Sequence, residues 1–303
     1  MNASLQSISA VIVTYNPERL QLTALVEALL PQVECIVIVD NGSSSGSIVL
    51  IRAAVGARPI ELILLEENLG IAAAQNKGIS HAKNLGSKYV MLFDHDSKPS
   101  GNMVSELMTA LREKERLGIR VAAVGPRYMD KRHNNPPPFI EVIGCRVKRH
   151  TCTEVSRVVP VSYLIASGSL MPMSTLDAIG GMNEDLFIDY VDIEWGLRAS
   201  QNGYSAFGVC GALMEHDLGD LPLHFFGMSI PYHSPLRHYY LFRNAVWLYR
   251  QGYVPLQWRI GDAWRLLLKY GFYSLYGKPR LAHLKMMSKG FWHGLTGQLG
   301  QYK

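Results

Sequence analysis

The chain has 303 residues, of which 48% are hydrophobic and 18% charged, a composition that is typical of globular proteins and excludes an intrinsically disordered one. No run of about 18 uncharged apolar residues occurs, so the sequence predicts no transmembrane helix. The formal net charge of +5 is unevenly distributed, because residues 250–303 hold nine of the 30 basic residues and one of the 25 acidic residues. A basic tail beside a mildly acidic body indicates an anionic partner for the tail.

The cysteines and the N-terminus bear on the compartment. The four cysteines form no CxxC pair and no zinc-site spacing, which predicts reduced structural thiols at Cys35, Cys145, Cys152 and Cys210. The first residues, MNASLQSISAVIVTYN, lack the basic region and the cleavage site of a signal peptide. Both observations predict a cytoplasmic protein.

Apolar runs alternate with helical patterns through the first hundred residues. The runs predict buried strands over residues 8–14, 35–39, 60–65 and 89–93, and the patterns between them predict helices over residues 18–30, 47–55 and about 71–85. Repeated alternation with short connections predicts an α/β fold with a doubly wound, mostly parallel sheet. The motifs GxGxxG and GxxxxGK[ST] are absent, which argues against a dinucleotide fold and a P-loop.

The alternation becomes less regular beyond residue 96. Further elements are predicted as a helix over 102–117, a strand over 121–124, a Pro-rich loop over 131–138, a strand over 158–166, a helical turn over 174–179 and a helix over 189–202. From about residue 234 the pattern is helical to the end. We therefore expect a nucleotide-binding and catalytic domain over residues 1–225 and a helical, basic and aromatic extension over residues 226–303.

Polar residues follow the predicted strands where each strand ends, namely at Thr14/Tyr15, Asp40, Asn68/Gly70 and Asp94/Asp96. In doubly wound sheets, ligands bind at the carboxyl ends of the strands. Asp94 and Asp96 follow the buried run YVMLF, and paired carboxylates with substrate phosphates are the ligands that Mg²⁺ or Mn²⁺ prefers. Taken alone, an Asp pair after a strand is more often a turn or a helix cap than a metal site.

Seven short motifs follow one another along the chain: VIVTYNP (11–17), VDNGS (39–43), ENLGIAAAQNKGI (67–79), FDHDS (93–97), SGS (167–169), GGMNEDLFIDYVDIEWGLR (180–198) and MEHDLG (214–219). In this order they resemble inverting, metal-dependent glycosyltransferases of family 2, which have the GT-A fold. The segments DHDS, FIDYVDIEW and HSPLRHYYLFRN (233–244) are most similar to the rhamnosyltransferase branch, which uses dTDP-L-rhamnose to build bacterial surface polysaccharides.

The resemblance implies roles for the strand-end residues. The nucleotide-sugar would be bound by Thr14, Tyr15, Asp40, Asn68, Gly70, Asn76 and Asp94, with Asp40 accepting the imide N–H of the base. The metal ligands would be Asp96, Asp94 and the late histidine His216. An Asx turn is the alternative interpretation of Asp40, and a structural histidine is the alternative for His216.

The resemblance also implies a carboxylate base on the acceptor side. Alignment back from Leu197-Arg198 places it at Asp192, although Asp189 and Glu194 stay open because the chain departs from the family pattern there. At helical spacing Asp189 and Asp192 share a face, whereas Glu194 is turned roughly 200° away. Charge at the start of a helix is the plain alternative for Asp192. Asp189, Glu194 and Arg243 would lie on the acceptor side.

The last fifty residues interleave aromatic and basic side chains, which suits helices lying on an anionic membrane surface. The composition also fits nucleic acid, but no nucleic-acid motif is present, so no such partner is expected. A dimer interface or a packed helical lid is the other interpretation. We therefore expect a cytoplasmic protein that is peripheral on the inner face of the cell membrane.

These observations predict an inverting glycosyltransferase that moves L-rhamnose from dTDP-L-rhamnose, with Mg²⁺ or Mn²⁺, to a cell-surface polysaccharide, lipopolysaccharide or lipid-linked glycan acceptor. Two other classes stay open, a nucleotidyltransferase and a non-catalytic module that binds sugar nucleotides or glycans. The first would need a Gly-rich phosphate loop after strand one, where this chain has YNPERL. The second would not need both Asp96 and Asp192.

Overall fold

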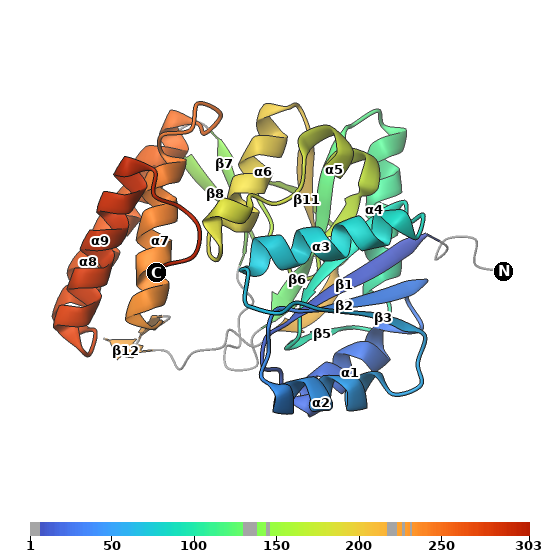
Figure 1. Cartoon of the computed structure of the whole chain (residues 1–303). Helices are drawn as coiled ribbons and strands as arrows, with labels where there is room; N and C mark the ends of the chain where they lie inside the picture. Colours follow the sequence, from blue (N-terminus) through green and yellow to red (C-terminus); the bar gives the residue numbers. More distant parts are fainter. Residues whose placement is uncertain (1–6, 130–137, 144–145, 217–222, 226–227, 231) are drawn as a thin grey trace.

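A computed structural model describes residues 7–129, 138–143, 146–216, 223–225, 228–230 and 232–303 (Figure 1). The strands described are β1 (Ile8–Thr14), β2 (Cys35–Asp40), β3 (Ile60–Leu64), β4 (Tyr89–Asp94), β5 (Ser97–Pro99), β6 (Val121–Met129), β7 (Phe139–Ile143), β8 (Arg146–His150), β9 (Val158–Val161), β10 (Leu170–Pro172), β11 (Ser205–His216), β12 (Leu223–Phe225) and β13 (Met228–Ile230). The helices described are α1 (Arg19–Leu29), α2 (Ser45–Val55), α3 (Ile71–Asn84), α4 (Met103–Arg116), α5 (Met173–Ile179), the 3-10 turn η1 (Glu184–Leu186), α6 (Val191–Gln201), α7 (Pro235–Leu248), α8 (Leu256–Tyr276) and α9 (Arg280–Thr296).

A single mixed sheet forms the centre of the molecule, with the strand order β3-β2-β1-β4-β10-β6-β11-β5 and with β9 paired to β11. Strands β3, β2, β1 and β4 are parallel, and β10 runs antiparallel between β4 and β6. The four parallel strands match the four predicted from the first hundred residues. The expectation of a mostly parallel α/β sheet with a helical C-terminal extension is therefore confirmed.

The two faces of the sheet are covered by different helices, as expected of a doubly wound fold. On one face, residues such as Ile8 and Ile12 pack with α1, α2 and α4. On the other face, Val11 and Val13 pack with α3, α5 and α6. Successive side chains of a strand point to opposite faces, so the apolar run ISAVIVT supplies both cores at once.

The register aligns the carboxyl ends of the strands. Thr14 on β1 pairs with Asp40 on β2, which in turn pairs with Leu64 on β3. On the other side of β1, Val13 pairs with Asp94 on β4. The predicted gathering of polar strand-end residues at one edge of the sheet therefore occurs.

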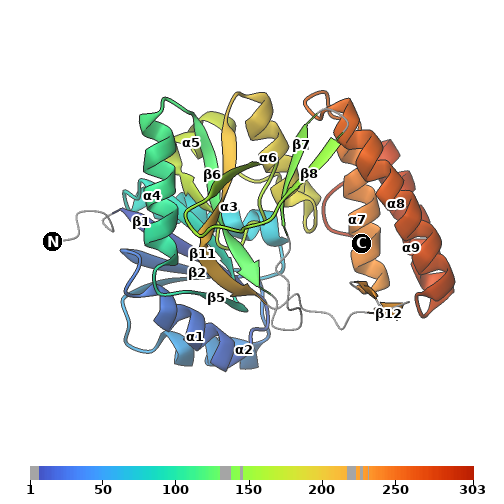
Figure 2. The same ribbon diagram turned by 180° about the vertical axis from the view of Figure 1, so that it is seen from behind.

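Helices α7, α8 and α9 stand together at one side of the sheet, with α7 nearest to it in both views (Figures 1 and 2). Their shared core includes Phe242 and Met287. Helix α9 lies very close to α7 because its glycines allow it: a Cβ on Gly290 would lie 2.4 Å from the Tyr239 carbonyl oxygen, and one on Gly294 2.5 Å from that of Arg243. The extension is thus a tightly packed helical unit.

Three predicted boundaries change. The strand predicted over 158–166 ends at Val161, and the strand predicted over 121–124 continues to Met129, where it pairs with β11. The helix predicted from residue 189 begins at Val191, because Asp189 and Tyr190 have left-handed backbones with φ of 62° and 64°. The predicted loop over 131–138 lies almost wholly outside the described residues.

The prediction of four reduced thiols is wrong for two of them. Cys152 and Cys210 form a disulfide, although 58 residues separate them in sequence. The loop after β8 runs beside β11, where the Cys210 N–H donates to the Arg157 carbonyl, and this contact brings the two thiols together. Cys35 is free and partly buried, while Cys145 lies outside the described residues. The thiols therefore no longer support a cytoplasmic location.

None of the helices in the described part of the chain is long and apolar enough to cross a membrane.

Candidate active site

The turn between β4 and β5 carries the acidic pair. Asp94 is the last residue of β4, and Asp96 immediately precedes β5. Ser167 secures this turn: its hydroxyl accepts the Asp94 N–H at 3.1 Å and lies 2.6 Å from the Ser97 hydroxyl. The SGS motif thus supports the acidic turn from a segment 70 residues away, a role that the sequence did not reveal.

The backbone of His216, the third predicted metal ligand, lies beside the acidic turn. Strand β11 pairs with β5 so that His216 lies opposite Ser97, the residue after Asp96. The side chain of His216 lies outside the described residues, and no group of three metal-ligand side chains occurs among those described. The two carboxylates of this turn are oxygen donors of the kind that a hard divalent cation prefers. The backbone of His216 lies across the β5–β11 strand pair from them.

Asp40 forms the Asx turn that was its alternative interpretation. Its carboxylate accepts the Thr14 hydroxyl at 2.9 Å and the Ser43 N–H at 2.9 Å, and all three groups come from the ends of β1 and β2. Asp40 and Thr14 are fully buried, whereas Tyr15 is 49% exposed. Tyr15 is therefore the group at this strand end that is open to a base, with Asp40 holding the turn beneath it.

Asn68 and Gly70 shape the loop before α3. Asn68 Oδ1 accepts the Asn41 amide at 3.1 Å and the Gly70 N–H at 2.9 Å, while Asn41 Oδ1 accepts the Leu69 N–H. Gly70 has φ +88°, and a Cβ there would lie 2.6 Å from the Phe187 carbonyl oxygen. Gly70 is therefore required because the backbone of Phe187 lies so close to it.

Asn76 joins α3 to the segment before α6. Its amide nitrogen donates to the Met182 carbonyl at 2.9 Å and to Glu184 at 2.8 Å, and its oxygen accepts the Met182 N–H. Both ends of the side chain are thus occupied within the protein. Asn76 thus positions the 182–184 segment, and the nucleotide contact expected for it stays a prediction.

Asp192 is in the first turn of α6, at the carboxyl edge of the sheet. It is partly buried, and its Oδ1 accepts the Ile193 N–H at 2.8 Å. Burial raises its pKa to about 6, and the carboxylates of Asp189 and Asp94 add to the increase. The base candidate and the acidic turn therefore lie within electrostatic reach of each other, although 98 residues separate Asp94 from Asp192.

Two tyrosines from other elements complete the surroundings of Asp192. Burial raises the pKa of Tyr128 on β6, and Asp192 raises it further. Burial also raises the pKa of Tyr163, which interacts with Arg265, Asp262 and Asp192. Neither tyrosine belongs to a recognisable motif, so no pattern in the sequence pointed to them.

The contacts of Glu194, the other open candidate for the base, favour a structural role. It is 1% exposed, and Arg198 donates to both of its carboxylate oxygens, at 2.8 and 2.9 Å. The Tyr253 hydroxyl adds a third hydrogen bond at 2.7 Å. A carboxylate with this many donors is a buried structural anchor between α6 and the loop before α8.

Arg243, which was expected on the acceptor side, makes its contacts within the protein. The side chain is fully buried and donates to the Leu186 carbonyl at 2.8 Å, the Asp185 carbonyl at 3.2 Å and the Gly300 carbonyl. Its guanidinium also lies over the Tyr240 ring, 4.8 Å from the centroid. Nothing in the periodicity of α7 distinguishes this arginine from an exposed one.

Asp189 lies where the segment before α6 meets α7. Arg237 donates to its carboxylate at 3.3–3.4 Å. Asp189 lies in the turn before the helix, so it is close to Asp192 for a different reason than the shared helix face expected from sequence. The charges of both carboxylates interact in this position.

The architecture brings polar strand-end residues and the carboxylate of Asp192 to one edge of a mixed α/β sheet. Solved structures with the same fold include GalNAc-T7 with UDP, GalNAc and Mn²⁺ (TM-score 0.62, 13% identity, 98% of this chain and 57% of that one). The S. aureus TarS 1-349 complex with UDP-GlcNAc is a second (TM-score 0.61, 15% identity, 95% and 81% covered). The central domain therefore has the GT-A fold.

Two sequence comparisons give the family. Residues 9–169 match the model of glycosyl transferase family 2. The chain is 34% identical over 296 residues to the dTDP-rhamnosyl transferase RfbF of Shigella flexneri, covering 97% of both chains, and 24% identical to the galactofuranosyltransferase GlfT1 of Mycolicibacterium smegmatis, covering 92% and 93%. The chain belongs to glycosyltransferase family 2.

Proposed function

We propose that this glycosyltransferase transfers L-rhamnose from dTDP-L-rhamnose to a glycan of the bacterial cell surface, with inversion at the anomeric carbon. The observation that carries the proposal is the full-length similarity to a dTDP-rhamnosyl transferase, which extends through the segment that contains Asp192. Residues 1–225 would bind the donor and perform the chemistry, and residues 226–303 would form the acceptor side.

Asp192 is the general base in this proposal. It accepts the proton of the acceptor hydroxyl as that oxygen attacks the anomeric carbon, and the bond from the sugar to dTDP breaks with its electron pair leaving on the diphosphate. Because its pKa is about 6, the carboxylate is ionised at neutral pH yet basic enough to take a proton. Tyr15 would stack on the base, and the Asp40 turn would shape the edge on which thymine is recognised.

Donor choice is tested by incubating the purified chain with dTDP-L-rhamnose, dTDP-D-glucose and UDP-L-rhamnose and measuring release of the nucleoside diphosphate. Comparison of dTDP-L-rhamnose with dTDP-D-glucose tests the choice of sugar, because the base is the same. Comparison of dTDP-L-rhamnose with UDP-L-rhamnose tests the choice of base, because the sugar is the same. We expect dTDP-L-rhamnose to react at least about tenfold faster than either, a typical result of a few altered contacts. A faster reaction with another donor would remove the rhamnosyl assignment.

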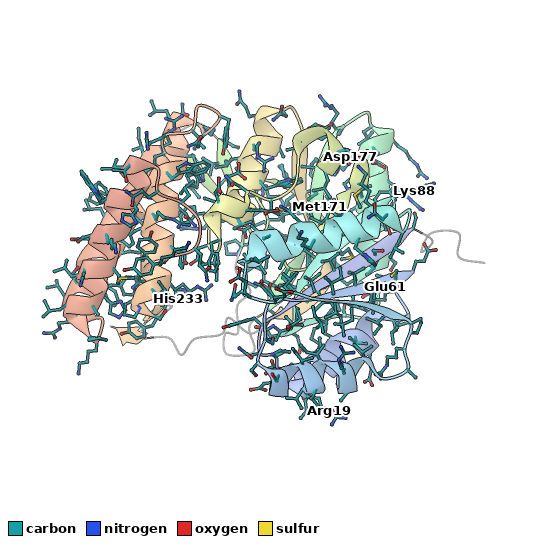
Figure 3. The ribbon with its side chains drawn as sticks, viewed as in Figure 1. Arg19, Glu61, Lys88, Met171, Asp177 and His233 are labelled. Atoms are coloured by element: carbon teal, nitrogen blue, oxygen red, sulfur yellow. A yellow bond between two sulfur atoms is a disulfide. The ribbon has the colours of Figure 1, made fainter. Side chains whose placement is uncertain are left out.

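The acidic turn is the proposed metal site, with Asp94, Asp96 and His216 as ligands of Mg²⁺ or Mn²⁺. A divalent cation there would neutralise the charge that develops on the departing diphosphate. In Asp96→Ala we expect dTDP to bind equally weakly with Mn²⁺ and with EDTA by calorimetry. The matched control is Asp177→Ala, which should keep the metal dependence. Figure 3 shows Asp177 on α5, and its carboxylate pairs with Lys83. Retained metal dependence in Asp96→Ala would remove this ligand.

The extension is the proposed membrane contact. Helix α8 exposes Ile260, Trp264, Leu267 and Leu268 (55–62% exposed), and α9 adds Leu281, Phe291 and Trp292. Basic residues accompany them, among them Arg280 and Lys285, and this combination suits an anionic lipid surface. The sheet domain would then face the cytoplasm from the inner side of the membrane.

Vesicle co-sedimentation tests this contact without any need for turnover. We expect binding to anionic vesicles that weakens as salt rises, and Trp264→Ser/Leu268→Ser should lose it. A control with the same change in polarity elsewhere, Leu20→Ser/Leu117→Ser, removes two exposed leucines of the sheet domain and should leave binding unchanged. Equal binding to neutral and anionic vesicles, or to neither, would contradict an electrostatic platform.

A further inference from the structure

A small cavity lies beside Asp192, between helix α6 and the sheet. Its volume is about 20 Å³, which is room for one small group such as a methyl. The buried part of its wall is mostly apolar and includes Leu92, Ala123, Met171 and Trp195. The partly exposed part of its wall includes Tyr163, Leu164, Ala166 and Asp192. The cavity therefore opens on the side of the proposed base.

The wall of this cavity offers few hydrogen-bonding partners. Ser169 is the polar residue of its buried part, and the Ser169 hydroxyl already donates to the Ile165 carbonyl at 2.6 Å. The carboxylate of Asp192 stands at the partly exposed end. A buried hydroxyl without a hydrogen bond is unfavourable, whereas a methyl group is stabilised by removal from water. The cavity therefore favours a small apolar group.

Residues 166–169 connect the cavity to the acidic turn. The Gly168 N–H donates to the Leu92 carbonyl at 2.7 Å, and the Leu92 N–H donates to the Ser169 carbonyl at 3.3 Å. In the same segment Ser167 accepts the Asp94 N–H, while Ser169 lines the cavity. One short segment thus secures the acidic turn and forms part of the cavity wall.

The side chains of β4 support the same placement. Leu92 and Asp94 are two residues apart on this strand, so their side chains point to the same face of the sheet. That face is the one covered by α6, because Leu92 packs in the same core as Trp195. The cavity is therefore bordered by the strand that ends in the acidic turn and by the helix that begins at the proposed base.

An inverting transfer determines where the donor sugar lies in such a site. The attacking hydroxyl and the departing group are on opposite faces of the sugar at the anomeric carbon. With the diphosphate at the acidic turn and the attacking hydroxyl at Asp192, the sugar ring lies between them, at the open end of the cavity. The ring is too large for a volume of about 20 Å³, but one of its substituents fits.

We propose that this cavity binds the methyl group of a 6-deoxy donor sugar and thereby selects such a sugar over one that carries a hydroxymethyl group. The inference rests on the proposed rhamnosyl transfer, since the methyl group of L-rhamnose is its carbon 6. It assigns the choice of sugar to wall residues such as Ala123, Met171 and Ala206. These residues determine specificity and take no part in the chemistry.

Three donors that differ only at this position test the unaltered chain. The sugar of dTDP-L-rhamnose has the methyl group, that of dTDP-L-mannose has a hydroxymethyl group, and that of dTDP-L-lyxose has a hydrogen atom. We expect kcat/KM for release of dTDP to be about 10- to 100-fold lower with each of the last two, the usual effect of one altered group in an apolar pocket. Equal use of dTDP-L-rhamnose and either analogue would overturn the proposal.

A variant with a filled cavity shows whether these wall residues make the choice. Ala206→Val adds two methyl groups at a partly exposed wall position on β11, where a β-branched residue suits the strand. We expect kcat/KM for dTDP-L-rhamnose to fall about tenfold, to the level of dTDP-L-lyxose, while the value for dTDP-L-lyxose stays the same. Ala123→Val on β6 fills the cavity from its buried side and serves if the first variant does not fold.

The matched control is Ala28→Val on α1, which makes the same change at another partly exposed alanine. Helix α1 packs on the opposite face of the sheet, so this variant should keep the ratio between dTDP-L-rhamnose and dTDP-L-lyxose. Equal affinity for dTDP alone establishes that the variants are comparable. An equal loss with both donors in the filled variant, or the same change of ratio in the control, would contradict the proposal.

A binding measurement separates this proposal from the transferase assignment. Calorimetry with Mn²⁺ and without acceptor compares the affinities for dTDP-L-rhamnose and dTDP-L-lyxose. The methyl group should strengthen binding at least about fourfold, the value of one buried carbon, and Ala206→Val should abolish this difference. If the two affinities are equal, or the difference persists in Ala206→Val, the proposal is wrong even where rhamnosyl transfer is observed. If the difference is found and abolished but no rhamnose is transferred, only the transferase assignment fails.

Discussion

The edge of the sheet and the helical extension use polar residues in opposite ways. At the sheet edge, polar groups such as Tyr15, Asp94 and Asp192 stay at least partly open, at the ends of strands or the start of a helix. In the extension, Arg243, Asn244 and His283 are fully buried and their hydrogen bonds stay within the protein. The comparison teaches that the sheet edge keeps some polar side chains accessible next to the buried pair Thr14 and Asp40, whereas these three polar side chains of the extension are used in internal contacts of the fold.

The most direct way to break the comparison is at Asp192. We expect Asp192→Asn to lower kcat by about 10²–10⁴, the usual contribution of a positioned general base, with dTDP affinity unchanged. Stability should be equal or higher at neutral pH, because burial makes the charged form of this carboxylate unfavourable. Glu194→Gln is the matched control: it should destabilise the fold through lost Arg198 contacts. Turnover near normal in Asp192→Asn would assign the base to Asp189.

Arg243 gives the converse test. Arg243→Met should lower the free energy of unfolding by about 3 kcal/mol or more, since the carbonyls of Asp185, Leu186 and Gly300 lose a buried charged donor. Urea unfolding measures this effect. Arg250→Met on the same stretch of chain loses only part-exposed contacts and should cost less. A stable Arg243→Met variant with a raised acceptor KM would restore the acceptor role first expected for it.

A buried pair of histidines sharpens the comparison through pH. His238 and His283 meet at 2.9 Å between their Nδ1 atoms, and burial lowers the pKa of His238 to about 3 and also lowers that of His283. Unfolded histidine titrates near 6.5, so only the unfolded chain takes up the proton as pH falls below that value. His238 should therefore cost about 1.4 kcal/mol of stability per pH unit from about pH 6.5 down towards about pH 3, and His283 should add to this loss in the same direction.

Denaturant unfolding between pH 4.5 and 7.5 measures that slope. In His238→Phe the slope of the unfolding free energy against pH should decrease by the contribution of one histidine. Asp192, whose pKa is raised, acts in the opposite direction below about pH 6, and it does so equally in both proteins. An unchanged slope would show that the pair does not control the acid stability of the extension.

The smallest expected effect is the pH dependence of turnover. Asp192 must be ionised to act as base, so kcat/KM should fall up to tenfold per pH unit below about pH 6 and level off above it. The profile of transfer rates between pH 5 and 8 measures this. Asp189→Asn removes one of the neighbouring negative charges and should move the midpoint to lower pH. A midpoint near 4 in the unaltered chain would contradict the buried position of this carboxylate.

Local patterns were sufficient for the four parallel strands β1 to β4 of the sheet, but not for β5, β10 and β11. The runs at 8–14 and 89–93 predicted strands because an apolar run of that length has few other structures available, and their polar ends predicted one active edge. The same reasoning misplaced the start of α6, because the left-handed backbones of Asp189 and Tyr190 depend on contacts from α7 more than 50 residues away.

The contacts that sequence could not supply are those between distant segments. The disulfide joins Cys152 to Cys210, the hydroxyl of Ser167 holds the acidic turn, and Arg243 reaches the carbonyl of Leu186. Each of these residues belongs to a type that is usually exposed or has many partners available. Only the three-dimensional arrangement decides which partner is used, so the contacts that Gly70 and Asn76 make with residues 182–187 could not be read from the sequence either.

The turn of positive φ before α6 has a consequence for how this enzyme can be altered. Phe187, Asp189 and Tyr190 all have positive φ, a conformation that costs L-residues roughly 1–2 kcal/mol each. Asn244 on α7 holds them there, because its single amide group donates to the carbonyls of Leu186, Ile188 and Asp189. A chimera that exchanges the C-terminal helices between two family members would separate the clamp from the turn that it holds. Recombination should therefore take residues 182–190 together with α7, even though a boundary between them looks natural in the sequence.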